Sequence, residues 1–433
     1  PGDPRRPAWE KACQRWVMSS LLRPADEHSA QTVDGRPVAE QFTGANIHDD
    51  FTLENHGFVH PDYMQCFGLS LGNALDYRLS GRKPPEAFLY NVQGIYENLK
   101  WFVLPDGGFV YPNGQDWTLF RNPCWLRSHL LMAVFGRDPD AWTLALRSLA
   151  ALDKMQARSK QGAIFDPTEY FFASTQPDMF RSLALSWLLL QSAGRIRDDF
   201  HQRMGVRRLD AGKIILNRTP TAVHTFSWGA RCMAQCVPYR LDRIVSPEQR
   251  NGIGHVRLKG GKGALPIAVR QVKVDGHDKG FTADLVLDHG RHVRAELCFI
   301  SAADGTWTMH EKLVALDDVT TAEIATGLIG ILNNRRWIYE TGRREVMIDG
   351  KTTVVPACSG KTLSSDTARQ VVVDSVLHIE SEAPLHVRYT AATRPERGRA
   401  TDRLCPNYLG AERAWKKGQV ISEFQVTVRC LAE

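Results

Sequence analysis

The feature that most constrains this fold is a change in hydrophobic periodicity near residue 215 of the 433-residue chain. Before it, apolar residues recur every three or four positions, as at Trp9, Cys13 and Trp16, which is typical of one helix face. After it, short runs alternate apolar and polar residues, as strands with one buried face do. We therefore expect a helical domain over residues 1–212 and an antiparallel sheet domain over residues 213–433.

The two halves differ in their expected elements. Helical patterns occupy residues 9–21, 63–79, 87–103, 117–134, 141–155 and 179–191. Glycine, proline and aspartate separate these patterns, which predicts antiparallel helices with short connections. Strands are expected at residues 282–287, 293–300, 307–314, 371–379, 385–390 and 420–428. Turns are expected at residues 275–276, 288–290, 304–305 and 349–350. Strands without intervening helices predict an antiparallel β-sandwich.

Composition narrows the class of protein. Hydrophobic residues make up 43% and charged residues 24%, as in ordinary globular proteins. No apolar run is long enough to span a membrane, and a net charge of +6 is modest for a nucleic-acid-binding protein. The nine cysteines follow no zinc-ligand spacing, so most are expected to be buried free thiols. We expect no cofactor and no metal ligand set, although a structural divalent cation is compatible with the sequence.

Polar side chains gather in residues 46–63, which contain seven ionisable or amide side chains besides those of the catalytic candidates Asn55, His56 and Tyr63. Pro61 is well placed to begin a helix. Asn55 and His56 then lie on the loop that enters this helix, and Tyr63 lies in its first turn. Loops of this kind often carry catalytic residues.

Three interpretations of residues 46–63 compete. The first is a solvated loop whose Asp and Asn side chains cap helices. The second is a metal site formed by His48, Asp49, Asp50 and His60, although their spacing matches no strong metal signature. The third, which we favour, is an acid/base site built from Asn55, His56 and a tyrosine.

The third interpretation fits one reaction, the β-elimination that removes the C5 proton of a uronic acid and expels the 4-linked sugar. The intermediate carries extra negative charge on the carboxylate, which an amide such as Asn55 can neutralise by hydrogen bonding. A neutral His56 or a tyrosine can take the proton, and a tyrosine can protonate the leaving oxygen. Asn, His and Tyr close together are therefore the groups that this reaction needs.

Asn55-His56-Gly57 on a loop before a helix resembles the Asn-His pair of polysaccharide lyases of the alginate lyase, heparinase II/III and chondroitin/hyaluronate lyase groups. Residues 106–117, rich in glycine and aromatic side chains, resemble a loop that such lyases carry further along the chain. The resemblance implies an α+β multidomain protein with an α/α-toroid, complete or incomplete, followed by an antiparallel β-sandwich. It also implies a carbon–oxygen lyase that leaves a 4,5-unsaturated uronate end.

The branches of this superfamily place the proton-donating tyrosine differently. Tyr63, close to His56, resembles the chondroitin/hyaluronate arrangement, whereas Tyr111 lies in the heparinase-like loop. Both remain candidates for the acid. Arg121 follows that loop on an expected helix, where its guanidinium group could bind the substrate carboxylate in a bidentate manner. The predicted catalytic set is Asn55, His56, Tyr63, Tyr111 and Arg121.

Further polar and aromatic residues are expected to bind substrate. His48, Glu54 and His60 lie in the same polar stretch as the catalytic candidates. The remaining four come from two loops and are Asn113, Gln115, Trp117 and Tyr170. The expected partner is an acidic polysaccharide rather than nucleic acid or a membrane. The resemblance and the size of such a substrate imply a secreted or periplasmic protein, and the sequence does not indicate the oligomeric state.

Two other functions remain open. A glycoside hydrolase on a similar helical barrel would use a carboxylate pair drawn from Asp49, Asp50, Asp116, Asp166 and Glu169, whose separation would set the stereochemical outcome. A carbohydrate-binding protein without catalytic activity would bind the polymer and release no product. The product distinguishes these functions, because only a lyase forms a new C4–C5 double bond.

Overall fold

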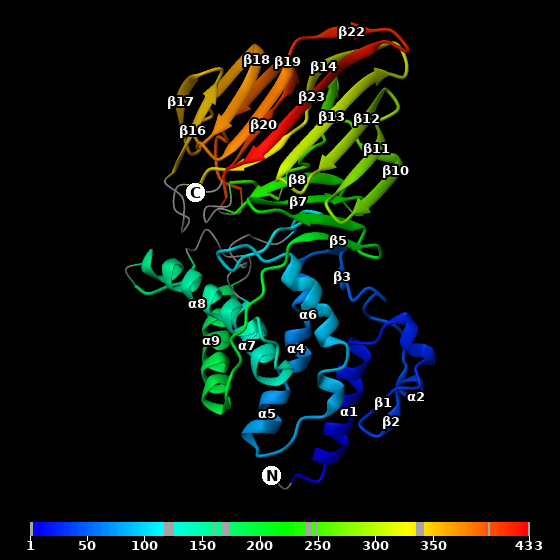
Figure 1. Ribbon diagram of the computed structural model, residues 1–433, viewed down its shortest axis with the longest axis vertical. Helices are drawn as coiled ribbons and strands as arrows, with labels where there is room; N and C mark the ends of the chain where they lie inside the picture. Colours follow the sequence, from blue (N-terminus) through cyan, green and yellow to red (C-terminus); the bar gives the residue numbers. More distant parts are fainter. Residues whose placement is uncertain are drawn as a thin grey trace. The chain divides into compact units, whose positions relative to one another are not determined.

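A computed structural model describes residues 3–116, 125–159, 161–165, 173–229, 231–239, 244–247, 249–334, 342–396 and 399–431. The chain is a mixed α+β protein, as expected, and divides into two compact units (Figure 1). The helical unit comprises Pro1–Phe109, Trp117–Arg203 and Leu209–Gly212. The sheet unit comprises Val110–Asp116, Met204–Arg208 and Lys213–Glu433.

The described α-helices all belong to the helical unit. They are α1 (Arg6–Ser20), α2 (Val38–Gln41), α3 (Pro61–Met64), α4 (Phe67–Leu71), α5 (Ala74–Leu79), α6 (Val92–Trp101), α7 (Leu126–Leu131), α8 (Ala141–Ala157) and α9 (Thr175–Ser192). Short 3₁₀ segments occupy Pro24–His28 and Glu86–Phe88, and a π-helical turn follows α7 at Met132–Gly136. Two small hairpins join β1 (Thr32–Val33) to β2 (Arg36–Pro37), and β3 (Glu54–Asn55) to β4 (Phe58–Val59).

The helical pattern over residues 63–79 forms three short helices, α3, α4 and α5, rather than one continuous helix. Two glycines one turn apart, Gly68 and Gly72, explain part of this difference. A Cβ atom at Gly68 would lie only 2.6 Å from the Ser128 hydroxyl of α7, and one at Gly72 would collide with the guanidinium group of Arg127. The glycines therefore serve close helix packing, at the cost of helix propensity in α4.

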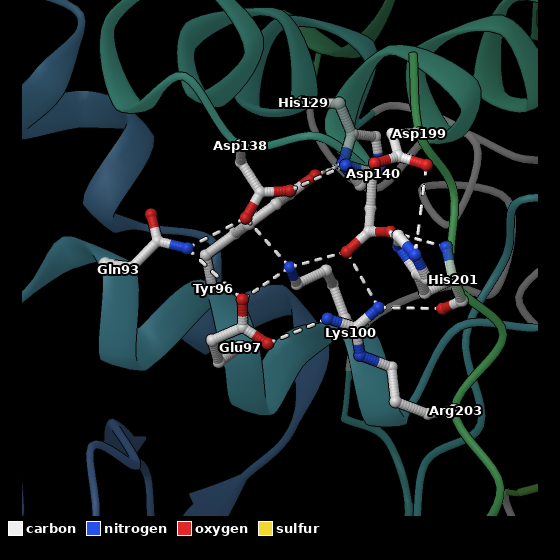
Figure 2. A network of polar contacts seen from close by, with 10 residues as sticks. All are labelled: Gln93, Tyr96, Glu97, Lys100, His129, Asp138, Asp140, Asp199, His201 and Arg203. Atoms are coloured by element: carbon white, nitrogen blue, oxygen red, sulfur yellow. Dashed lines mark hydrogen bonds and ion pairs between the residues drawn. The ribbon is translucent and has the colours of Figure 1, made fainter. Parts of the chain in front are cut away.

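A buried charge network joins three segments of the helical unit (Figure 2). Nζ of Lys100 on α6 lies 2.8 Å from carboxylate oxygens of both Asp138 and Asp140, which precede α8. Arg203 donates to Asp140 at 2.7 Å and to Glu97 at 2.9 Å. Each buried charge thus has an opposite charge within hydrogen-bonding distance, which offsets the loss of hydration.

The sheet unit contains a four-stranded sheet and a fifteen-stranded sheet. The four-stranded sheet has the order β5 (Gly205–Leu209), β6 (Ile214–Arg218), β7 (Ala222–Ser227) and β8 (Met233–Pro238). The large sheet follows the path β10 (Ile267–His277), β11 (Gly280–His289), β12 (Val293–Ser301), β13 (Thr306–Ala315), β23 (Val420–Cys430), β19 (Leu377–Thr390), β18 (Thr362–Val373), β16 (Arg343–Ile348) and β17 (Lys351–Pro356). Pairs off this path involve β9 (Gly254–Leu258), β14 (Val319–Thr326), β15 (Ile329–Leu332), β20 (Thr401–Cys405), β21 (Asn407–Leu409) and β22 (Arg413–Trp415).

Burial follows the alternation that the sequence shows. Buried residues occupy every second position of β13, whereas all six residues of β7 and of β8 are buried. The two sheets pack through aromatic rings, since Phe226 of β7 lies 5.6 Å from Phe299, which stacks at 5.7 Å on Trp307. These side chains form part of the hydrophobic core of the sheet unit.

Two local expectations in this unit are wrong. Residues 371–379 form the end of β18, a turn and the start of β19, because Asp374 and Ser375 adopt left-handed φ values of 52° and 58°. Residues 275–276 lie inside β10 rather than in a turn. A Cβ atom at Gly276 would lie 2.9 Å from a methyl group of Ile215, so this glycine permits close packing against β6. No described helix is both long enough and apolar enough to cross a bilayer.

Candidate active site

The candidate site begins with a two-residue turn between β3 and β4. Asn55 lies opposite Phe58 in the hairpin, and His56 and Gly57 connect the strands. Both connecting residues have positive φ, 53° for His56 and 78° for Gly57, as the central residues of a type I′ turn do. The turn places His56, an exposed residue, at the tip of the hairpin.

Tyr63 lies beside this tip, in the first turn of α3. Pro61 occupies the first turn of the helix, as expected, where its lack of an N–H group removes no helical hydrogen bond. Tyr63 is 4% exposed, and its hydroxyl oxygen lies 3.1 Å from Nδ1 of His56. The two rings meet edge to face, with centroids 5.9 Å apart. The structure thus brings together two of the predicted catalytic residues.

His60, the residue before α3, supports the ring of Tyr63. Its imidazole stacks on the phenol ring with centroids 4.1 Å apart and an interplanar angle of 19°. His60 is fully buried and also contacts the ring of Phe58 on β4. The stack fixes the plane of the phenol, so the Tyr63 hydroxyl keeps its direction toward His56.

The Tyr63–His56 contact can carry a proton. A phenol hydroxyl both donates and accepts, and a neutral imidazole has one nitrogen of each kind. The tautomer of His56 therefore decides which partner donates in the hydrogen bond. An acid and a base held in one hydrogen bond are suited to taking a proton from one atom and delivering another to a leaving group.

Three more predicted residues lie in the first strand of the hairpin or in the segment before it. Asn55 directly precedes His56 and is exposed. Oε2 of Glu54 lies 3.9 Å from Nε2 of His48, and both side chains are partly exposed. An amide, a carboxylate and a second imidazole are therefore available to a ligand near His56.

Asp49 and Asp50 hold the loop before the hairpin. An Asp49 carboxylate oxygen accepts a hydrogen bond from the Ala25 amide at 2.9 Å. Asp50 accepts from the amide and hydroxyl of Thr52 and, through its other oxygen, from the amide of Ala211 at 2.9 Å. Their carboxylates thus stabilise the backbone, so the structure does not favour them as a hydrolytic pair. Among the described residues, no group of three or more His, Cys, Asp or Glu side chains could hold a metal ion.

The loop over residues 110–116 belongs to the sheet unit and contains three predicted site residues. Tyr111, Asn113 and Gln115 are each at most 3% exposed. Gln235 of β8 donates to the carbonyl oxygen of Tyr111 at 2.8 Å, and Asn251 donates to Gln235 at 3.3 Å. Buried amide side chains therefore fix the backbone of this loop.

The structure does not place every candidate. Arg121, Trp117 and Tyr170 lie outside the described residues, as do Asp166 and Glu169 of the hydrolase alternative. Asp116 is described and lies at the end of the 110–116 loop in the sheet unit.

A pocket of about 280 Å³ in the helical unit contains arginines that the prediction did not include. It lies between α4, α7 and α9, and Gln65, at the end of α3, contributes to its wall. Arg127 and Arg181 line it together with Trp125 and one carboxylate, that of Asp178. No sequence motif links α7 with α9, so only the packing of these helices reveals the site.

The two arginines give the pocket a positive charge. Burial and the nearby charge of Arg181 lower the pKa of Arg127 from its usual value, although Asp76 opposes this shift. Arg127 donates to the carbonyl oxygen of Gly68 at 3.0 Å. An anion bound between the two arginines would relieve their mutual repulsion.

Comparison of the sequence with known proteins gives no match. No protein-family model matches the chain, and no curated protein resembles it in sequence.

Comparison of the fold does find similar solved structures. A xanthan lyase from Paenibacillus aligns with 92% of this chain at a TM-score of 0.54 and 8% sequence identity. A chondroitin AC lyase from Streptomyces coelicolor aligns with 90% of the chain at 13% identity and a TM-score of 0.47. A heparan sulfate lyase from Pedobacter heparinus aligns with 89% at 8% identity and a TM-score of 0.43.

This chain spans only part of those proteins, 42% of the xanthan lyase, 55% of the chondroitin AC lyase and 53% of the heparan sulfate lyase. The match to the xanthan lyase shows a shared fold across most of this chain. This match, at 8% identity, is one of fold alone, and it agrees with the fold that the resemblance to polysaccharide lyases implied.

Proposed function

We propose that this protein is a polysaccharide lyase that cleaves a uronic-acid-containing polymer by β-elimination. The observation that carries the proposal is the hydrogen-bonding contact between Tyr63 and His56, 3.1 Å long, at the tip of a hairpin next to Asn55. The fold shared with a xanthan lyase supports the same class of reaction. Fold likeness alone does not define chemistry, so the side chains carry the argument.

In the proposed mechanism, the amide of Asn55 donates a hydrogen bond to the uronate carboxylate and stabilises the charge that develops when C5 loses its proton. His56 accepts that proton or polarises the substrate. Tyr63 delivers a proton to the leaving oxygen, with Tyr111 as the alternative acid. His60 keeps the phenol ring of Tyr63 in position.

The arginine pocket supports an acidic substrate. Arg127 and Arg181 line the same cavity, and Gln65 in its wall follows Tyr63 by two residues. A uronate carboxylate or a sulfate group on a neighbouring sugar would bind there through charge-assisted hydrogen bonds. His48 and Glu54 would contact sugar hydroxyls nearer to His56, and Arg121 would assist in binding the carboxylate.

The proposal extends to the arrangement of the helices and sheets. We propose that the helices belong to an α/α-toroid and that the two sheets form the β-sandwich of such lyases. We also propose that the protein acts outside the cytoplasm, because a long acidic polymer does not enter it. The reaction as written uses no metal ion or other cofactor.

The test is an absorbance assay with the purified chain and a panel of acidic polysaccharides that includes alginate, chondroitin, hyaluronan, heparan sulfate and xanthan. The expected result is a rise in ultraviolet absorbance from a C4–C5 double bond with one polymer, and its loss in the His56→Ala variant. New reducing ends without this absorbance would instead indicate a hydrolase. Binding without any product would indicate a carbohydrate-binding protein.

A further inference from the structure

Two cysteines from distant parts of the sheet unit meet in its core. Cys236 lies in β8 of the four-stranded sheet, and Cys430 is the last residue of β23 in the large sheet. Their sulfur atoms are 3.3 Å apart although 194 residues separate them in the chain. Both are buried, with 6% and 3% exposure.

The surrounding packing fixes this approach. His224 is the partner of Cys236 in the ladder between β7 and β8, and its Nδ1 lies 2.8 Å from the Ser301 hydroxyl at the end of β12. Phe226, also on β7, contacts the ring of Phe299 on β12. Cys430 itself pairs with Leu377 in the ladder between β23 and β19. The packing of the four-stranded sheet against the large sheet therefore sets the distance between the two sulfur atoms. It does not depend on the rotamer of one cysteine side chain.

We propose that Cys236 and Cys430 form a disulfide bond that covalently joins the four-stranded sheet to the last strand of the large sheet. A disulfide needs a sulfur–sulfur distance of about 2.05 Å, which the thiols reach by closing a gap of roughly 1.3 Å, a change that small side-chain rotations and a slight backbone shift can supply.

The oxidant is a disulfide, either a small molecule such as oxidised glutathione or a protein. One cysteine thiolate attacks the external disulfide, forms a mixed disulfide and releases one thiol. The second cysteine thiolate then attacks the sulfur of the first cysteine, forms the Cys236–Cys430 bond and releases the other thiol. In total, two protein thiols are oxidised and one external disulfide is reduced to two thiols.

Burial determines when this exchange occurs. The hydrogen bond with Cys430, together with desolvation, raises the pKa of Cys236 well above its usual value, so the folded protein disfavours the reactive thiolate. The attack on the external disulfide therefore takes place before β8 and β23 pack against each other, and their packing then brings the second cysteine to the mixed disulfide. The finished bond is then shielded from reductants, which suits a protein that folds in an oxidising compartment.

Cys232 and Cys405 are the matched controls. Both are buried in the sheet unit, and desolvation raises the pKa of each to about 12. Cys232 lies only four residues before Cys236 in the chain. If the fold did not select the pair, thiol–disulfide exchange would place Cys232 in a disulfide as often as Cys236.

The experiment refolds the full chain from urea in a glutathione redox buffer, blocks free thiols with N-ethylmaleimide and maps peptides by mass spectrometry without reduction. The expected result is a linked pair of peptides containing Cys236 and Cys430, two hydrogens lighter than their sum. The link persists in Cys232→Ser and Cys405→Ser and is lost in Cys430→Ser.

Maleimide on both Cys236 and Cys430 in the refolded wild-type protein would overturn the proposal, as would a link from either cysteine to a different partner. The peptide map of the wild-type protein tests the proposal even if a cysteine variant fails to fold. A second readout is the rate of reduction by dithiothreitol, which we expect to be many-fold slower in buffer than in urea. This inference is independent of the proposed function, because no enzymatic activity enters the measurement.

Discussion

The hydroxyl oxygen of Tyr63 lies 3.1 Å from Nδ1 of His56, which precedes it by seven residues. The contact joins the tip of the β3–β4 hairpin to the first turn of α3. It requires the left-handed conformation of His56 and the helix start at Pro61. Both members of this acid/base pair thus come from one short chain segment.

Replacing Tyr63 by phenylalanine tests the role of its hydroxyl group. If Tyr63 is the acid, Tyr63→Phe removes the transferable proton and lowers kcat by about 100-fold or more, within the usual range for general acid catalysis. Folding should change little, because the ring still stacks on His60. Formation of the C4–C5 double bond, followed by ultraviolet absorbance, provides kcat, and urea unfolding provides stability.

Tyr96→Phe is the matched control, because Tyr96 also contacts a histidine in the helical unit. Its hydroxyl lies 2.8 Å from Nδ1 of His129, and both residues are fully buried (Figure 2). This variant should keep its kcat and lose about 1–3 kcal/mol of stability, because a buried nitrogen loses its partner. Full activity in Tyr63→Phe would remove Tyr63 from the mechanism.

A second prediction concerns the turn that presents His56. Gly57 has a φ of 78°, which an L-residue adopts only with strain, so Gly57→Ala should lower stability by about 1 kcal/mol. It should also lower kcat, since any relaxation of the turn moves His56 away from Tyr63. Gly81→Ala is the control, because Gly81 has a φ of 71° and nothing within 4 Å of an added Cβ atom. A kcat loss of equal size in both variants would contradict this argument.

The sequence predicted those parts of the structure whose conformation depends on residues adjacent in the chain. Pro61 indicated the start of α3, and the stretch containing Asn55, His56 and Tyr63 indicated the acid/base group. Predictions from local sequence were wrong where tertiary packing determines the local structure. Gly276 resembles a turn residue but lies inside β10 to make room for Ile215.

Tertiary packing also explains why the arginine pocket was not predicted in full. Arg127 and Arg181 are 54 residues apart and meet only because α7 packs against α9. Arg127 lies on the expected helix that follows the glycine-rich loop, but no sequence pattern points to Arg181. The loop with Tyr111 illustrates the same limit, because its sequence lies among helices while its contacts, such as that with Gln235, are to strands.

The arginine pocket leads to a third prediction. Arg181→Gln removes one of two positive charges that would bind an acidic sugar, so KM should rise several-fold while kcat stays nearly constant. The salt dependence of KM should also weaken, since partly exposed charges are screened by ions. Arg195→Gln, at an exposed position of the same unit, should change neither value. An unchanged KM in Arg181→Gln would exclude Arg181 from substrate binding.

A fourth prediction concerns the charge network in Figure 2. Lys100→Met leaves Asp138 and Asp140 without their shared cation, and such a loss in a buried ion pair typically costs about 3–5 kcal/mol. Urea unfolding at pH 7 measures this loss. Lys416→Met, which breaks the exposed pair with Asp318, should leave stability unchanged and serves as the control.

The pH dependence of this network has a definite sign. Burial alone would raise the pKa of Asp140, but hydrogen bonds from Lys100 and the His201 amide hold it below its usual value. A carboxyl group with a lowered pKa stabilises the fold above its unfolded-state pKa, and this stability is lost as pH falls through the folded-state pKa. The difference in stability between wild type and Lys100→Met should therefore shrink below about pH 4.

The last prediction concerns Glu311, a fully buried carboxyl group on β13. Desolvation raises its pKa from 4.5 to about 8, although the Thr326 hydroxyl and the Asn407 amide donate hydrogen bonds to it. Between these two values the folded state binds a proton that the unfolded state has released. Stability therefore falls as pH rises, by up to roughly 1.4 kcal/mol for each pH unit from about pH 5 to pH 8.

Glu311→Gln should remove this slope, because glutamine stays neutral and its carbonyl oxygen can still accept from Thr326 and Asn407. The variant should be more stable than wild type above pH 8, where the wild-type protein must hold a buried negative charge. Urea unfolding from pH 5 to pH 9 measures the slope for both proteins. Glu296→Gln, at an exposed position on β12, should keep the wild-type slope. An unchanged slope in Glu311→Gln would show that Glu311 ionises at its ordinary pKa in the folded protein.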